Sequence, residues 1–255
     1  MSPHPRCPRR RAGQYGAGHA RQHRRGCFPE HQLARGLSSA PAPAPALRPT
    51  SHTHGVVLAG GSARRLGGVP KGLLELAGRR LIDRVLDALD EVSDELLLIA
   101  NDPAAGGWAP GIPLRADVRA EGGALAGLHS ALTHASDAAM VVAWDMPFVN
   151  AGLLRALREL GETRRGAALP ESARGLEPLC AYYPAPLRSV AESLLARGER
   201  RVGAFVEALR ASNSLHVLPA GAVARYGDPA RLFLNVNTPA DLAEARRLAD
   251  QPGSW

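Results

Sequence analysis

The sequence predicts an α/β domain built around a mostly parallel central sheet. Three continuous apolar runs, residues 55–59, 95–100 and 140–144, are typical of strands buried on both faces. Segments with helical spacing of apolar residues separate these runs, so strands and helices alternate along the chain. Such units join parallel strands by right-handed helical crossovers that cover both faces of a sheet. We therefore expect a single three-layer α/β/α domain.

Three helices are expected to follow the first strands of this domain. Residues 79–92 form one, because their apolar side chains recur on one face. A shorter strand over 114–118 is followed by two glycines and an Ala/Leu-rich helix that ends near residue 135. Asn150 is expected to cap the next helix, since an asparagine side chain accepts a hydrogen bond from the first turn.

The second half is expected to add further strands and helices. Residues 166–185 contain two apolar runs around a polar turn, and a helix starts near Pro186 and is interrupted at 198–201. The last helix starts at Thr238, with proline in its first turn and an acid at its third position. The remaining expected strands are residues 215–218, at an edge of the sheet, and residues 232–237.

The positive charge of the chain is confined to its first 54 residues. The whole chain carries +7, but residues 1–54 hold nine arginines and a single acid, which leaves −1 for the remainder. A neutral folded part gives no support to nucleic-acid binding. The Arg, Pro and Ala content of residues 1–54 predicts a disordered extension before a domain at 55–250. An organelle transit peptide and a dispensable addition both fit this composition, and we favour the second.

Signals for export and membrane insertion are missing from the sequence. No apolar run reaches the ~18 residues needed to cross a bilayer, and no apolar core of a secretory signal is present. Cys7, Cys27 and Cys180 are too scattered for a disulfide framework or a zinc site. We expect a cytoplasmic protein.

The glycine-rich stretch from Leu58 to Lys71 is the strongest functional signal. It follows a buried strand and carries paired glycines, two arginines and a lysine. Glycines let backbone N–H groups approach an anion, and arginine and lysine suit phosphate oxygens. It is not a Walker loop, because Lys71 follows Pro70 and precedes Gly72, and it lacks the dinucleotide glycine spacing. We predict a loop that wraps a polyphosphate; a glycine-rich surface turn is the alternative.

Polar residues follow four of the predicted strands. They are Gly60–Gly61, Asn101, Asp117 and Asp145. Ligands of open parallel sheets bind beyond the carboxyl ends of the strands, so these residues are expected to converge. Asp145 directly follows an apolar run, where a carboxylate can hold Mg²⁺ against phosphates. An aspartate that caps a helix or lies in a loop is an equally good interpretation of this position alone. Asn101 and Asp117 suit a base or ribose, but are also common turn residues.

Two further polar groups are weaker candidates. Arg200 and Arg201 stand side by side at a helix break, where a solvated charged turn is the simpler interpretation. Asn235 and Asn237 lie two apart on a predicted strand and are expected on one face of it, as a site wall or an exposed edge.

The glycine-rich stretch resembles the signature of the nucleotidyltransferase superfamily, which runs Leu-Ala-(Ala or Gly)-Gly, a small residue, Arg, Met or Leu, Gly, then Lys. The matching positions are Leu58 to Gly61, Ala63, Arg65, Leu66, Gly67 and Lys71. Within the superfamily the chain most resembles the molybdenum cofactor guanylyltransferases, on the basis of residues 60–61, 63–68, 145–147, 198–202 and 235–239. The likeness runs from Gly55 to about Leu248. Pro70 departs from it, since the family often has an acid there.

The resemblance implies a Rossmann-like nucleotidyltransferase domain that transfers GMP from GTP to molybdopterin carrying molybdenum, with Mg²⁺ and release of pyrophosphate. The positions implied to contact GTP are Leu58, Ala59, Gly60, Gly61, Lys71, Asn101, Asp117 and Asp145. Lys71, Arg65 and Asp145 are the implied catalytic residues, and Asp145 the implied metal ligand. The pterin side is implied for Arg200 or Arg201, Asn235 and Asn237. The nucleotide-binding half would be 55–150 and the acceptor half 151–250.

The same resemblance sets the expected partners and the alternatives. The partners are GTP and molybdopterin carrying molybdenum, then molybdoenzymes or their chaperones; a monomer without nucleic-acid or membrane partners is expected. The alternatives are a cytidylyltransferase for the same pterin, a sugar-phosphate nucleotidyltransferase, and a non-catalytic module that delivers the cofactor. The resemblance places Ala at position 60 in the cytidylyl relatives, whereas Gly60 leaves room for a purine.

Overall fold

The computed structural model describes residues 51–60, 65–66, 68–119 and 122–251, without the side chains of residues 65 and 66. The expected extension lies outside this range up to residue 50 and stays a prediction. The first strand starts at Thr53, two residues before the expected start of the domain. The backbone N–H of Thr53 donates to Asp94 Oδ2 at 2.8 Å, which adds this residue to the fold.

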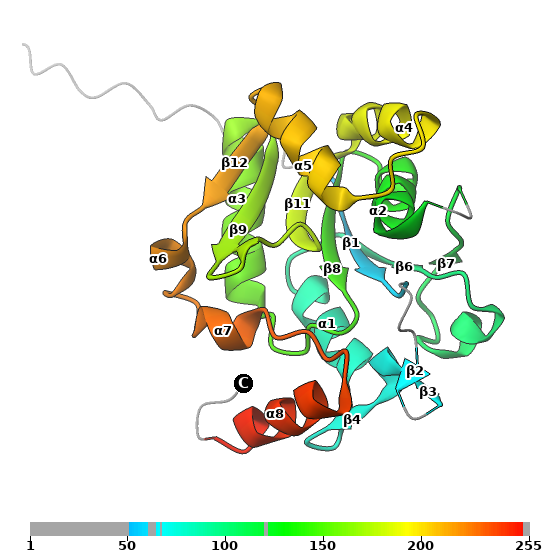
Figure 1. The fold of residues 1–255 in the computed structure, drawn as a ribbon, viewed down its shortest axis with the longest axis vertical. Coiled ribbons are helices and arrows are strands. Elements are labelled where there is room, and N and C mark those ends of the chain that lie inside the picture. Colours follow the sequence, from blue (N-terminus) through cyan, green and yellow to red (C-terminus); the bar gives the residue numbers. More distant parts are fainter. Residues whose placement is uncertain (1–50, 61–64, 67, 120–121, 252–255) are drawn as a thin grey trace, which may run out of the picture. The chain divides into compact units, whose positions relative to one another are not determined.

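A mostly parallel sheet forms the centre of the domain (Figure 1). Its strand order is β10-β9-β11-β8-β1-β6-β7, and β12 pairs with β9. In this sheet, β10 and β11 run in the direction opposite to the other strands. The strands are β1 Thr53–Leu58, β6 Glu95–Ile99, β7 Leu114–Arg115, β8 Ala138–Ala143, β9 Ala167–Ser172, β10 Gly175–Leu176, β11 Cys180–Pro184 and β12 Leu215–Leu218.

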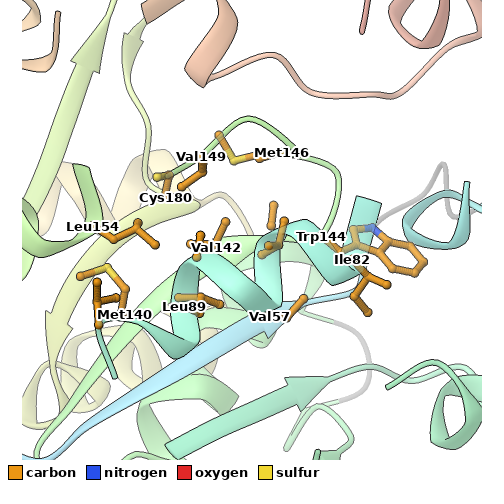
Figure 2. Close-up of a cluster of buried hydrophobic side chains, with 14 of the residues drawn as sticks. Val57, Ile82, Leu89, Met140, Val142, Trp144, Met146, Val149, Leu154 and Cys180 are labelled. Carbon is orange, nitrogen blue, oxygen red and sulfur yellow. The ribbon is translucent and has the colours of Figure 1, made fainter. Parts of the chain in front are cut away.

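Helices cover both faces of the sheet, as the sequence predicts. Alternate side chains of a strand point to opposite faces, so Val57 joins one core cluster and Val56 the other. The first cluster, drawn in Figure 2, packs the sheet against α1 and α3, and the second packs it against α2, α4 and α5. The helices are α1 Leu81–Asp90, α2 Gly123–His134, α3 Ala151–Arg164, α4 Arg188–Ala196, α5 Val202–Ala211, α6 Ala220–Val223, α7 Pro229–Leu232 and α8 Pro239–Ala249. Within the described ranges, none of them has the length and apolar character that crossing a bilayer requires.

A third, smaller core lies beside the main sheet and joins distant parts of the chain. It contains Leu76, Leu81, Val236 and Leu242, and so packs α8 against the segment that follows Lys71 (Figure 1). That segment consists of η1 Lys71–Leu73, β4 Glu75–Leu76 and β5 Arg79–Arg80, and the short strands β2 Arg65–Leu66 and β3 Val69–Pro70 precede it. Two further 3₁₀ helices lie elsewhere, η2 Pro103–Gly107 and η3 Ala185–Leu187.

The edge of the sheet at which the parallel strands begin is held by Arg158 of α3. Its guanidinium donates to two backbone carbonyls, Val92 O at 2.7 Å and Ser51 O at 2.9 Å. It also donates to Glu162 Oε1 at 2.9 Å and to Asp94 Oδ2 at 3.4 Å. One planar side chain thus joins α3 to the segments that lead into β1 and β6. We call this edge of the sheet the amino edge.

Most expected elements are confirmed, and one strand is wrong. Asn150 caps α3 by accepting from Leu153 N at 3.0 Å, and Thr238 and Asp241 form the capping box of α8. Residues 232–237 were expected to be a strand, but Leu232 ends α7 and the next residues form an extended loop. Asn235 and Asn237 therefore do not share a strand face. The loop is fixed instead by Val236, whose N–H donates to Asp145 O at 2.9 Å.

Candidate active site

The carboxyl ends of four neighbouring strands lie level with one another. In the strand register, Leu58 at the end of β1 stands opposite both Ile99 and Ala143, the last residues of β6 and β8. Ile99 in turn stands opposite Arg115, the last residue of β7. The residues that follow these strands therefore emerge at one edge, as predicted. We call it the carboxyl edge.

A buried ion pair occupies the middle of this edge. Lys71 Nζ donates to Asp145 Oδ2 at 2.8 Å and to Asn237 Oδ1 at 2.5 Å. Lys71 is 4% exposed and Asp145 7% exposed. Buried charges of this kind persist only when they are paired and hydrogen-bonded. The structure thus joins three residues that are 74 and 166 positions apart in the chain.

Local structure explains how the three side chains meet. Pro70 precedes η1, which begins at Lys71, and the third core holds the segment that follows. On the other side, Asp241 Oδ2 accepts from the backbone N–H groups of Asn237 and Thr238 at 3.0 and 2.8 Å. These bonds keep the pKa of Asp241 below its usual value although burial raises it. The capping box of α8 therefore also fixes the backbone that presents Asn237.

Asn101 and Asp117 form a second pair at the same edge. Asn101 Nδ2 donates to Asp117 Oδ2, and Asp117 N donates back to Asn101 Oδ1, both at 2.7 Å. The reciprocal bonds join the ends of β6 and β7 and orient both side chains. A Cβ at Gly127 of α2 would lie 3.7 Å from both Asp117 Oδ1 and Leu58 Cδ2, so this pair lies close to the end of β1.

The start of the glycine-rich stretch is open at Gly60. The backbone of Leu58 and Ala59 is used by the sheet, since Ala59 N donates to Ile99 O and Leu58 O accepts from Trp144 N. A Cβ at Gly60 would meet no atom of the described residues within 4 Å. Packing of these residues therefore does not require glycine at this position. Gly61 lies outside the described residues, as does the side chain of Arg65.

The two adjacent arginines are not equivalent. Glu199 accepts from Arg201 Nε and Nη2 at 3.1 and 2.7 Å, and from the backbone N–H groups of Arg200 and Arg201. The side-chain bonds from Arg201 are the main reason why the pKa of Glu199 falls to about 2. The guanidinium of Arg201 is thus held by Glu199. The backbone of Arg200 lies beside the start of α2, since a Cβ added at Gly123 would lie 3.6 Å from Arg200 O.

The donor set is consistent with a cation that is shared with a substrate. No cluster of three or more His, Cys, Asp or Glu side chains suited to a metal ion occurs among the described residues. Asp145 can supply one carboxylate at the carboxyl edge. Mg²⁺ is commonly held by one or two carboxylates and completes its shell with water and substrate phosphates. Asp145 therefore fits a magnesium ion that arrives with a nucleotide.

Two informative features were missed in the sequence. Lys71 is the only lysine of the chain, which holds 31 Lys and Arg residues in total. Arginine thus serves at every other cationic position, and the one compact ammonium group lies in the buried ion pair. This signal was visible by counting. The contact between Lys71 and Asn237 was not visible, because it depends on tertiary packing across most of the domain.

Comparisons with known proteins show the family to which the chain belongs. The family model described as "MobA-like NTP transferase domain" matches residues 55–213. The chain is 35% identical over 198 residues to the molybdenum cofactor guanylyltransferase of Cereibacter sphaeroides, covering 76% of this chain and 95% of the relative. It is 36% identical over 198 residues to a probable molybdenum cofactor guanylyltransferase of Pelotomaculum thermopropionicum, covering 77% and 93%.

A solved structure shows the same architecture. The molybdopterin-guanine dinucleotide biosynthesis protein A of Archaeoglobus fulgidus superposes with a TM-score of 0.65 at 28% identity, covering 76% of this chain and 97% of that one. The resemblance drawn from the sequence motifs is therefore confirmed, as is the α/β nucleotidyltransferase fold. The chain belongs to the MobA-like NTP transferase family and is a nucleotidyltransferase whose relatives are molybdenum cofactor guanylyltransferases.

Proposed function

We propose that this protein transfers GMP from GTP to molybdopterin carrying molybdenum, in the cytoplasm, and releases pyrophosphate. The observation that supports the proposal most directly is the buried contact between Lys71 and Asp145 at the carboxyl edge. It brings a phosphate-neutralising cation and a metal-binding carboxylate to one point. Asn101 and Asp117, which follow the adjacent strands β6 and β7, lie at the same edge.

The proposed reaction is an in-line displacement at phosphorus. An oxygen of the pterin's terminal phosphate forms a bond to the α-phosphorus of GTP. The bond from that phosphorus to the oxygen bridging the α- and β-phosphates breaks, and pyrophosphate leaves. A phosphate is already a nucleophile, so no general base is required. The protein contributes positioning and charge neutralisation.

Each member of the carboxyl edge has a role in this proposal. An ammonium group has three N–H donors, and within the described residues Lys71 directs two of them to Asp145 and Asn237. The third can meet a phosphate oxygen. Arg65 and the backbone N–H groups of Gly60 and Gly61 would hold the remaining phosphate charge, beside Leu58 and Ala59, whose backbone is bonded within the sheet. The Asn101–Asp117 pair would bind the ribose or base, with the guanine over Gly60.

The proposed metal is Mg²⁺, held by Asp145. When bound, it would neutralise charge on the phosphates and orient the α-phosphate. Since Asp145 Oδ2 accepts from Lys71 in this structure, the carboxylate and the ammonium group already lie within hydrogen-bond distance of one another. Lys71 would then hold Asp145 in orientation as well as neutralise the phosphates.

The pterin would lie on the side of the acceptor half. Arg200 or Arg201 is proposed to line the pterin side, together with Asn235 and Asn237. Asn237 would have a second role, since it accepts from Lys71 and therefore links the acceptor side to the phosphate-binding lysine. Asn235 donates to Phe233 O at 3.2 Å, which keeps its side chain close to its own loop.

A direct assay tests the proposal. The protein is incubated with Mg²⁺, molybdopterin carrying molybdenum, and GTP, CTP, ATP or UTP at equal concentration. We expect GMP to become attached to the pterin with one pyrophosphate released per product. The Lys71→Met variant is the matched control, and loss of product with it assigns the activity to this site.

Other outcomes would contradict the proposal. Preferential attachment of CMP would identify a cytidylyltransferase. Transfer to a sugar phosphate, with the pterin left unmodified, would identify a sugar-phosphate nucleotidyltransferase. Tight pterin binding without pyrophosphate release from any nucleotide would identify a delivery module.

A further inference from the structure

Trp144 connects the two segments that carry the buried ion pair. Its backbone leads directly into Asp145, and its N–H donates to Leu58 O at the end of β1, at 3.2 Å. Its side chain, labelled in Figure 2, belongs to the first core cluster and is 1% exposed. The indole stacks on Trp108, which caps η2, with ring centroids 5.0 Å apart and an angle of 25° between the planes.

The same ring presses against the backbone that follows Lys71. A Cβ at Gly72 would collide with Cε3 of Trp144 and lie 2.9 Å from Cδ2 and 3.1 Å from Cζ3. Gly72 has no positive φ, so this contact, and not backbone conformation, requires glycine. The indole therefore determines how closely η1 approaches the end of β8.

The contacts of the ring with Gly72 and Trp108 depend on its shape. Its Nε1–H is buried and has no hydrogen-bond partner in the described structure. An unsatisfied buried donor is destabilising, and a purely apolar ring of similar size would avoid that penalty. What the indole alone provides is its width, which fills the space between Gly72 and Trp108.

We propose that Trp144 is a positioning residue that sets the placement of Lys71 relative to Asp145. One side of its ring supports the backbone of Gly72, next to Lys71, and its own backbone carries Asp145 one residue later. The ring width thus sets where the ammonium group lies. The inference rests on the proposed function for its catalytic meaning, but the placement of Lys71 can be measured without the reaction.

The single lysine provides that measurement. Protein labelled with ¹⁵N-lysine has one side-chain amine signal in its NMR spectrum, because Lys71 is the only lysine. We expect Trp144→Leu and Gly72→Ala to shift or broaden this signal, and Trp144→Phe to shift it less. An unchanged signal in the folded Trp144→Leu protein would overturn the proposal.

Kinetics then distinguish positioning from general packing. With GTP and the molybdenum-loaded pterin as substrates, Trp144→Leu is expected to lower kcat about ten-fold while KM for GTP changes less than about two-fold, since small displacements of a catalytic group lower turnover steeply. Trp144→Phe should lose less. In Gly72→Ala, adding Trp144→Leu should restore part of the lost kcat by removing the collision. Equal kcat in all folded variants would overturn the proposal.

Gly161 of α3 offers a matched control. A Cβ there would collide with the ring of Tyr182, so Gly161→Ala introduces the same kind of conflict at the amino edge. Its melting temperature should fall, while its lysine signal and its kcat below the melting temperature should equal those of the parent. A shift of the lysine signal in Gly161→Ala as large as in Gly72→Ala would overturn the proposal. If the protein transfers no GMP but its lysine signal still shifts in the Trp144 variants, the positioning role of Trp144 is supported and only the proposed function is refuted.

Discussion

The two edges of the sheet each hold a buried or half-buried cation, and the cations differ. At the amino edge, Arg158 donates to four acceptors, two of which are backbone carbonyls. At the carboxyl edge, Lys71 contacts two side-chain oxygens. A guanidinium holds many acceptors in one fixed geometry, whereas an ammonium group rotates its three donors among changing partners. On the proposed function, one edge maintains the fold and the other exchanges hydrogen-bond partners during the reaction.

The largest expected effect comes from removing the lysine. Lys71→Met should lower kcat by about a hundred- to a thousand-fold, as for the loss of one preorganised transition-state donor. It also leaves Asp145 as a buried unpaired carboxylate, so the melting temperature should fall as well. Initial rates measured well below that temperature, with circular dichroism to verify folding, separate the two effects.

Lys71→Arg sharpens the same point. It retains the charge but replaces a compact group with a planar fork in a site that is 4% exposed. We expect kcat to stay at least about ten-fold below the parent value. Full activity in this variant would show that charge alone is sufficient and would remove the distinction between the edges.

Arg158→Lys is the reciprocal change at the amino edge. A lysine has three donors and cannot reproduce the four contacts of the guanidinium, so we expect the free energy of unfolding to fall by about 1–3 kcal/mol. Urea unfolding at pH 7 measures it. Turnover by the folded variant should equal that of the parent, and a selective loss of kcat would contradict a structural role for this edge.

Gly60→Ala tests the carboxyl edge without disturbing its packing. Because a Cβ at this position meets no atom of the described residues within 4 Å, the melting temperature should change by little. If guanine lies over Gly60, the ratio of kcat/KM for GTP to that for CTP should fall about ten-fold, roughly 1.4 kcal/mol. An unchanged ratio would place the base elsewhere.

The smallest expected effect concerns the pH dependence of stability at the amino edge. The backbone N–H of Thr53, with help from Arg158, lowers the pKa of Asp94 below its usual value. A carboxyl group with a lowered folded-state pKa stabilises the fold above its unfolded pKa, near 4, and this contribution disappears as the pH falls through the folded value. Asp94→Asn should therefore melt below the parent at pH 6, and the difference should shrink steadily as the pH falls below about 4. A difference that does not shrink with falling pH would assign the effect to packing.

Local patterns predicted most of the fold, and tertiary contacts decided the rest. The apolar runs at 55–59, 95–100 and 140–144 became β1, β6 and β8 within two residues, because strands buried on both faces need continuous apolar sequence. Residues 232–237 show the same apolar character, but Phe233 packs into the first core and Val236 bonds to Asp145 O. Those contacts turn a predicted strand into a loop, and no local pattern reports them.

The site was predictable in its parts but not in its connections. Residues that follow parallel strands must emerge at one edge, so the meeting of Asp145, Asn101 and Asp117 at that edge followed from the fold class. The pairing of Lys71 with Asn237 needed the third core and the capping box of α8. The importance of the ring width of Trp144 depends on its contact with Gly72, which the sequence does not reveal.

The strand directions have a wider consequence. β9 and β12 are parallel to each other and antiparallel to β11, so they end at the same edge as β1, β6, β7 and β8. Loops that follow these strands at the carboxyl edge can change in length or sequence without contacting the residues of the amino edge. Replacement of such loops is therefore a way for this fold to bind a different acceptor while the contacts of the amino edge stay the same.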